Sequence, residues 1–234
     1  MARNGENQWH TSEDWMPKEA RLVNLYLDSD GHANSMNGDG RVTLTPAETG
    51  SDAYVYDPEF PCGGEGDGFD DGLVSPYKCN SRQIRSDVLV YDTPVLDQDI
   101  AIAGPLYAEL YAASSAVDTD FIVRVSDVDE QGTARNVSFN IIRAEFRKGW
   151  DKPELLTPGK IEKYEMEMYF YGMVFKKGHK IRIDISSSEL MEAFPNTNTG
   201  IDPYTDPKPI KATQTIYHGR EYPSHVKLPV LYGL

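Results

Sequence analysis

Apolar and polar positions alternate with a period of two along much of the chain. Every second side chain is charged over 164–168, and over 181–185 three isoleucines alternate with an arginine and an aspartate. This alternation is typical of strands with one buried and one polar face. Two longer apolar runs, 106–112 and 121–128, are rich in β-branched and aromatic residues, so they predict central strands packed on both faces.

The remaining pattern also predicts strands. Further strands are predicted over 23–27, 42–44, 54–56, 88–91, 136–146, 213–217 and 226–230. We expect 136–146 to pair with the central strands, and 174–185 to form a strand, a turn and a second strand. No apolar period of 3.6 residues is sustained, and only 189–194 favours a short helix. Strands joined by turns without intervening helices predict an all-β fold, an antiparallel sandwich or jelly roll.

We expect a single domain over 1–234, with one long loop excursion at about 60–82 that is too glycine-rich for regular structure. The hydrophobic share of 39%, with 14 Tyr and 8 Phe, is sufficient for an ordinary core. The formal net charge of −14 repels phosphate backbones and anionic lipids, so neither nucleic acid nor membrane is an expected partner.

The start of the chain lacks the apolar stretch of a secretory signal, which makes the cytoplasm the default expectation for its location. Cys62 and Cys79 flank the glycine-rich loop. They could form one disulfide in an oxidising compartment, but the missing signal favours two thiols.

The serines do not form a recognisable catalytic motif. No serine has glycine two residues away on both sides, as the nucleophile elbow of an α/β-hydrolase requires. The serines at 114–115 and 186–188 lie in strand-like segments, where hydroxyls commonly bond to the backbone. We therefore assign no catalytic residue to this chain and expect no cofactor.

Metal binding has only weak support. His218 and His225 could meet across a hairpin, but their spacing matches no standard zinc pattern. Asp28, Asp30 and Asp39 superficially suggest calcium, yet the spacing of an EF-hand is missing and Asp–Gly pairs favour turns for backbone reasons. Turn chemistry is the preferred interpretation, with a surface calcium as the alternative.

A series of short segments carries a family resemblance. They are GENQW at 5–9, WMP at 15–17, YDP at 56–58, DVLVY at 87–91, ASSAVDTDF at 113–121, LTPG at 156–159, FKKGHKIR at 175–182, NTNTG at 196–200 and QTIYH at 214–218. In this order and spacing, they closely resemble the carboxy-terminal domain of X-Pro dipeptidyl-peptidases and CocE/NonD-type serine hydrolases. The resemblance covers nearly the whole chain.

The resemblance implies a galactose-binding-like jelly roll that packs against an α/β-hydrolase domain, in the same chain or as a separate one. That domain carries the Ser-Asp-His triad. The resemblance also implies that the loop after YDP faces the catalytic domain, where Phe69 would contact the substrate pocket. A solvated, mobile loop is the alternative for this segment. Trp9 and Trp15 are expected in the core or in interdomain packing rather than as ligand platforms.

The sequence is compatible with three functions. The leading one is a non-catalytic domain that stabilises a serine hydrolase and shapes its substrate site. The second is a free-standing carbohydrate or small-ligand binding module, which predicts exposed aromatic side chains near Asp, Asn or Arg at a loop end. The third is an independent hydrolase with an unusual site. An isolated domain that normally buries one face should expose an apolar patch and self-associate, so a homo-oligomer is also considered.

Overall fold

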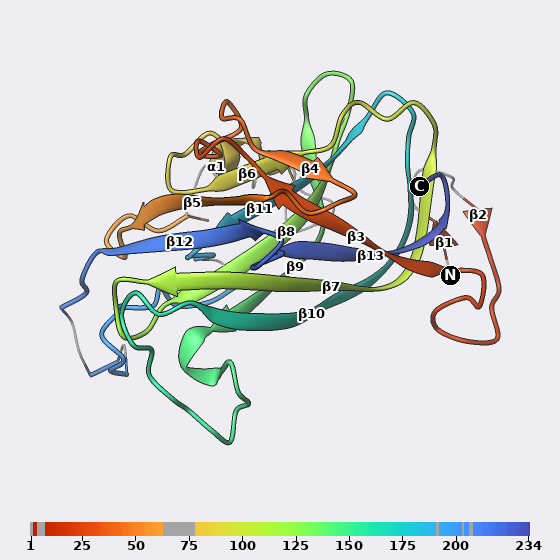
Figure 1. The fold of residues 1–234 in the computed structure, drawn as a ribbon. Coiled ribbons are helices and arrows are strands. Elements are labelled where there is room, and N and C mark those ends of the chain that lie inside the picture. Colours follow the sequence, from red (N-terminus) through yellow and green to blue (C-terminus); the bar gives the residue numbers. More distant parts are fainter. Residues whose placement is uncertain (1, 4–7, 63–77, 191, 203, 206–207) are drawn as a thin grey trace.

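The computed structural model describes residues 2–3, 8–62, 78–190, 192–202, 204–205 and 208–234 (Figure 1). Its elements are β1 (Ala2–Arg3), β2 (Gln8–Trp9), β3 (Arg21–Asp28), β4 (Arg41–Thr43), β5 (Thr49–Tyr56), α1 (Asn80–Gln83), β6 (Leu89–Asp92), β7 (Ile100–Ser114), β8 (Asp120–Val128), β9 (Ala134–Arg143), η2 (Ala144–Phe146), β10 (Glu162–Phe175), β11 (Lys180–Ser186), β12 (Ala212–Gly219) and β13 (His225–Tyr232). No helix among these is long and apolar enough to cross a membrane.

The longest strand, β7, organises the first layer of the fold. Its 15 residues pair with β10 along one edge, and with β12 and β13, one after the other, along the opposite edge. The strands β5 and β3 continue this layer outward, on β12 and β13 respectively. In Figure 1, β7 runs from the side where the two chain ends lie to the opposite side of the domain.

The second layer contains β6, β11, β8 and β9 in that order. It is joined to the first through β4, which pairs antiparallel with β3 and makes a single parallel contact with β6 between Arg41 and Asp92. The isoleucines of β11 and the apolar residues of β7 and β8 belong to one buried cluster between the layers. The predicted antiparallel sandwich is confirmed, whereas the jelly-roll connectivity stays a prediction.

Strand pairing differs from the sequence expectation in two places. The segments around the turn at 176–179 do not pair with each other, because β10 pairs with β7 in the first layer whereas β11 pairs with β6 and β8 in the second. The predicted strand 136–146 ends at Arg143 and continues as the 3-10 helix η2. It forms its ladder with β8 but not with β7, which already has partners on both edges.

The short helix expected at 189–194 is wrong for its described residues, which form turns. Here the backbone N–H of Leu190 donates to the carbonyl of Cys62, 2.9 Å away. The Glu189 side chain is buried against two arginines. These contacts hold the segment against the sheet. A helix that the pattern did not predict, α1, covers the outer face of β8 and β11, where Gln83 donates to Asp184 over 2.7 Å.

Candidate functional site: an aromatic patch beside an acidic groove

Two exposed aromatic side chains meet where the N-terminal segment crosses β10. We call Trp15 and Phe170 the aromatic patch. They are 59% and 43% exposed, respectively. Trp15 and Phe170 pack edge to face with their ring centroids 5.3 Å apart. Since large aromatic rings carry much of the binding energy in protein interfaces, such an exposed pair is a candidate contact surface.

A β-bulge explains why two consecutive residues of β10 both face solvent. The register between β10 and β7 shifts between Glu167 and Phe170. Up to Met168 the strand alternates strictly between buried and exposed positions, and then Tyr169 and Phe170 are both exposed. An extra residue in a strand turns the following side chain to the other face, and bulges are common next to functional sites.

The N-terminal segment is held on the sheet by a close contact at Gly104 of β7. The φ angle of Gly104 is +138°, and a Cβ there would approach Cγ of Met16 to 2.9 Å. Glycine therefore serves both the backbone conformation and the close approach of Met16. The neighbouring Pro17 is buried, and this anchoring fixes Trp15 over Phe170.

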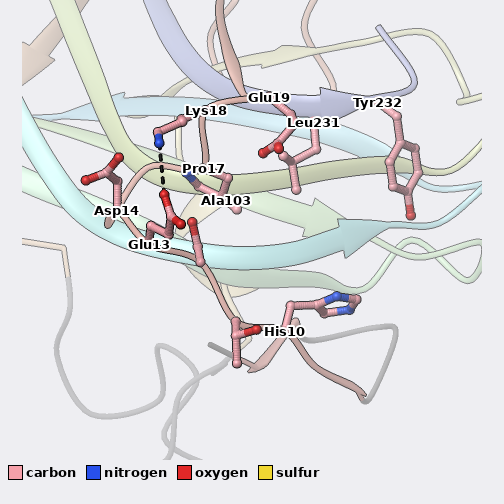
Figure 2. A pocket seen from close by; sticks show the side chains of 11 residues that line it. His10, Glu13, Asp14, Pro17, Lys18, Glu19, Ala103, Leu231 and Tyr232 are labelled. Atoms are coloured by element: carbon pink, nitrogen blue, oxygen red, sulfur yellow. Dashed lines mark hydrogen bonds and ion pairs between the residues drawn. The ribbon is translucent and has the colours of Figure 1, made fainter.

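A groove of about 600 Å³ lies beside the patch, between the N-terminal segment and the ends of β7 and β13 (Figure 2). We call it the N-terminal groove. Its lining residues are His10, Thr11, Ser12, Glu13, Asp14, Pro17, Lys18, Glu19, Ala103, Leu231 and Tyr232.

The charges of the N-terminal groove are mostly negative. Figure 2 shows Lys18 paired with Glu13, at an Nζ–Oε2 distance of 2.9 Å. Asp14 and Glu19 have no ionic partner in the described part of the chain. Three carboxylates against one lysine make the groove complementary to a basic side chain. The patch and the groove together are named the docking surface below.

The structure describes two of the three residues predicted to make contacts, Trp9 and Trp15. Trp15 is part of the aromatic patch, and Trp9 of β2 is 82% exposed, so the alternative that either tryptophan belongs to the core is wrong. Phe69 lies outside the described residues. Phe170 was not singled out from the sequence, although the break in alternation at 169–170 is a visible signal for it.

A buried cluster of Ser29, Asp52 and His218 has the composition of a catalytic triad. The Nε2 atom of His218 lies 3.1 Å from Oγ of Ser29 and 3.2 Å from Oδ2 of Asp52. Ser29 and Tyr91 both donate to the same carboxylate oxygen, over 2.7 and 2.8 Å. Burial alone raises the pKa of Asp52, but hydrogen bonds from His218, the Ala33 backbone and these two hydroxyls outweigh it and lower the pKa.

The geometry of this cluster is structural rather than catalytic. In a triad the histidine uses one nitrogen for the serine and the other for the carboxylate. Here Nε2 faces both groups, while Nδ1 is buried with no partner among the described residues. All three side chains are buried, and a Cβ on the cross-strand Gly50 would lie only 2.1 Å from Cε1 of His218. No substrate can reach this serine.

The two histidines considered as a metal pair are not brought together. No hairpin joins β12 to β13, because β7 is long enough to pair with both strands in succession. His225 instead lies 2.6 Å from the carbonyl of Pro223 through Nδ1, and its ring packs on Tyr26.

The calcium candidates have other contacts. Asp28 and Asp30 both accept from Arg41, over 2.7 and 2.8 Å. Asp39 accepts from the backbone of His32 over 3.1 Å. In the described ranges, no three His, Cys, Asp or Glu side chains are arranged to hold a metal ion.

Cys62 and Cys79 are both buried thiols. Burial raises the pKa of the Cys79 thiol, although the nearby Arg124 opposes this shift. A raised pKa keeps the thiol protonated and unreactive.

The sequence of this chain matches the model of a known protein family. The model of the X-Pro dipeptidyl-peptidase C-terminal non-catalytic domain matches residues 1–227. The chain belongs to this family. The resemblance expected from the sequence motifs is thereby confirmed.

Several relatives share nearly the whole chain. A cocaine esterase from Rhodococcus sp. (strain MB1 Bresler) is 33% identical over 232 residues, which are 97% of this chain and 40% of that protein. An aminopeptidase from a marine-sediment Thaumarchaeota archaeon superposes with a TM-score of 0.87 at 26% identity, over 98% of this chain and 40% of its own. An α-amino acid ester hydrolase superposes with a TM-score of 0.80 at 26% identity, over 97% of this chain and 40% of its own. The chain thus corresponds to an accessory domain that is less than half of each relative.

Proposed function

We propose that this chain binds an α/β-hydrolase catalytic domain through its docking surface, stabilises that domain and shapes its substrate site. The observation that carries the proposal is the exposed Trp15–Phe170 pair. Relatives that contain this domain are larger proteins with hydrolase names, in which the matched part is 40% of the chain.

Energetics support the aromatic patch as the contact. Removing a large apolar side chain from water contributes about 1.5–3 kcal/mol. Two rings that already pack together lose little further side-chain freedom on binding, so more of this energy remains for association. The acidic N-terminal groove beside the rings adds orientation, because it favours a basic group opposite and disfavours an acidic one.

The complete enzyme in this proposal transfers an acyl group from an ester or an amide to water. The nucleophile and the general base come from the catalytic domain, because the described part of this chain holds neither in an accessible geometry. The contribution of the present chain to the substrate site, including the role suggested for Phe69, is to form one wall of the acyl pocket.

The proposal is tested by comparing the hydrolase domain alone with the hydrolase domain joined to this chain. We expect the joined protein to unfold at a higher temperature and to hydrolyse p-nitrophenyl esters or X-Pro p-nitroanilides faster. A catalytic domain with the same Tm and the same kcat/KM with and without this chain would refute the proposal. Purified alone, this chain should hydrolyse neither substrate.

A further inference from the structure

A second pocket lies at the opposite end of β7 from the docking surface. The N-terminal groove includes Ala103, near the start of β7, whereas this pocket includes Asp118, just after its end at Ser114. It measures about 490 Å³, and we call it the distal pocket. Its lining residues are Asp118, Arg143, Glu145, Phe146, Phe194, Asn196, Thr197, Gly200, Ile201, Asp202 and Tyr204.

The walls of the distal pocket are aromatic and open to solvent. Phe194 and Tyr204 are 65% and 78% exposed, and their rings meet edge to face at a centroid distance of 5.4 Å. Phe146 contributes a further ring, which is supported by Trp150 at 4.7 Å. Exposed rings without apolar cover present flat faces to a ligand that has both C–H and polar groups.

The floor of the pocket is a rigid polar network. The Nδ2 atom of Asn196 donates to Asp118 over 2.7 Å and to Asp120 over 2.9 Å. Arg143 binds Asp120 through Nε and Nη2, over 2.9 and 3.2 Å. Asp118 also accepts from the backbone of Glu145 over 3.0 Å. Asp118, Asp120 and Asn196 are each at least 95% buried, so these groups are held in place before any ligand arrives.

The network leaves hydrogen-bonding capacity unused. Asp118 accepts from Asn196 and from the backbone of Glu145. Each carboxylate oxygen can accept more than one hydrogen bond, so Asp118 can also accept from a ligand.

The charged groups of the floor can exchange hydrogen bonds with the hydroxyls of a polar ligand. Arg143 pairs with Asp120. Burial, with the charge of Asp120 adding to it, raises the pKa of Asp118 to about 6. Asp118 is therefore mostly ionised at neutral pH, and an ionised carboxylate accepts hydrogen bonds.

We propose that the distal pocket binds a saccharide. One sugar ring would lie against Phe194 and Tyr204, with its hydroxyls directed to Asp118, Asn196 and Arg143. The volume is within the range of small-molecule sites, and it suits one or two sugar units. Because the pocket and the docking surface lie at opposite ends of β7, the site stays open when a catalytic domain is bound.

The test measures binding of individual sugars to the whole chain. Glucose, galactose, mannose, cellobiose and lactose are titrated by isothermal calorimetry and by protein-observed NMR. We expect saturable binding of at least one of them, with a Kd on the order of 1 mM. The double variant F194A/Y204A should bind at least tenfold more weakly. Both side chains are exposed, so its Tm should be unchanged.

The matched control is Tyr169→Ala, which removes a comparably exposed tyrosine of β10 outside the distal pocket. It should bind the sugar as the original chain does. The proposal is overturned if none of the sugars saturates, if F194A/Y204A binds as tightly as the original chain, or if choline binds and the sugars do not. None of these outcomes bears on association with the catalytic domain, which is measured separately.

Discussion

The hydroxyl of Ser29 has a structural role, because it donates a hydrogen bond to Asp52 and its side chain is buried. We predict that Ser29→Ala lowers the free energy of unfolding by about 1–3 kcal/mol, because the buried carboxylate loses a charge-assisted hydrogen bond. Chemical denaturation measures this loss. In the joined enzyme, kcat for p-nitrophenyl esters should stay the same. A large loss of kcat at unchanged stability would contradict the structural role.

The carboxyl of Asp118 makes stability depend on pH in a specific direction. Because burial raises its pKa to about 6, the folded chain binds a proton that the unfolded chain has already released between pH 4 and 6. This contribution is complete below the unfolded pKa and is lost as the pH rises through about 6. A shift of this size corresponds to about 3 kcal/mol.

Asp118→Asn removes this titration. We predict that the Tm of the variant, relative to that of the original chain, rises between pH 5 and pH 8. Thermal unfolding at several pH values gives the comparison. Asp97→Asn, which changes an exposed carboxylate, should give a curve parallel to that of the original chain. Parallel curves for Asp118→Asn as well would show that Asp118 does not titrate in this range.

Three elements are joined by one buried carboxylate. Glu189 follows β11 and binds both Arg82 of α1 and Arg124 of β8; its Oε1 lies 2.9 Å from Nη2 of Arg82. All three side chains are at most 3% exposed. Removing one partner of a buried ion pair is costly because it leaves an uncompensated charge.

We predict that Glu189→Gln destabilises the chain by about 3–5 kcal/mol, since two buried guanidinium groups then lack their carboxylate. Urea denaturation measures the change. Glu192→Gln, three residues along the chain and exposed, is the matched control and should shift the midpoint little. A similar midpoint for both variants would show that the arginines find other partners.

The strands could be predicted from the sequence because alternation and β-branched runs report local burial. The isoleucines of β11 point into the core as expected. The pairing partners could not be predicted, because they depend on the length of β7, which takes two strands along one edge. The sequence pattern also did not predict that α1 covers the outer face of β8 and β11. Its four residues are too few for a periodic signal, and its contacts come from distant segments.

The candidate site was only partly predictable. Trp15 was identified from a motif, but its partner Phe170 depends on a bulge, and the distal pocket is assembled from three separate segments. Motifs report residues that are close in sequence, whereas both surfaces combine residues from segments that are far apart in the sequence. The prediction of exposed aromatic side chains near Asp, Asn and Arg does describe the distal pocket.

At the scale of the whole molecule, the docking surface predicts how the chain behaves with its catalytic domain. In W15S/F170S we expect the affinity between the two separately purified parts to fall at least tenfold, because two interface rings are lost. Surface plasmon resonance gives the Kd. Trp150→Ser, which removes a comparably exposed ring at the distal end, should leave the Kd unchanged. An unchanged Kd for W15S/F170S would locate the contact elsewhere.

The two buried thiols allow the opening of the second layer to be followed chemically. The backbone of Cys62 forms hydrogen bonds with Ser188 and Leu190, and that of Cys79 forms one with Ala134. The two cysteines are therefore held at different places in the sandwich. A buried thiol reacts with iodoacetamide only while its surroundings are open. If one opening exposes both Cys62 and Cys79, their alkylation rates will be equal and will change together in Glu189→Gln. If separate openings expose the two cysteines, mass spectrometry will resolve two alkylation rates, and Glu189→Gln will change only one of them.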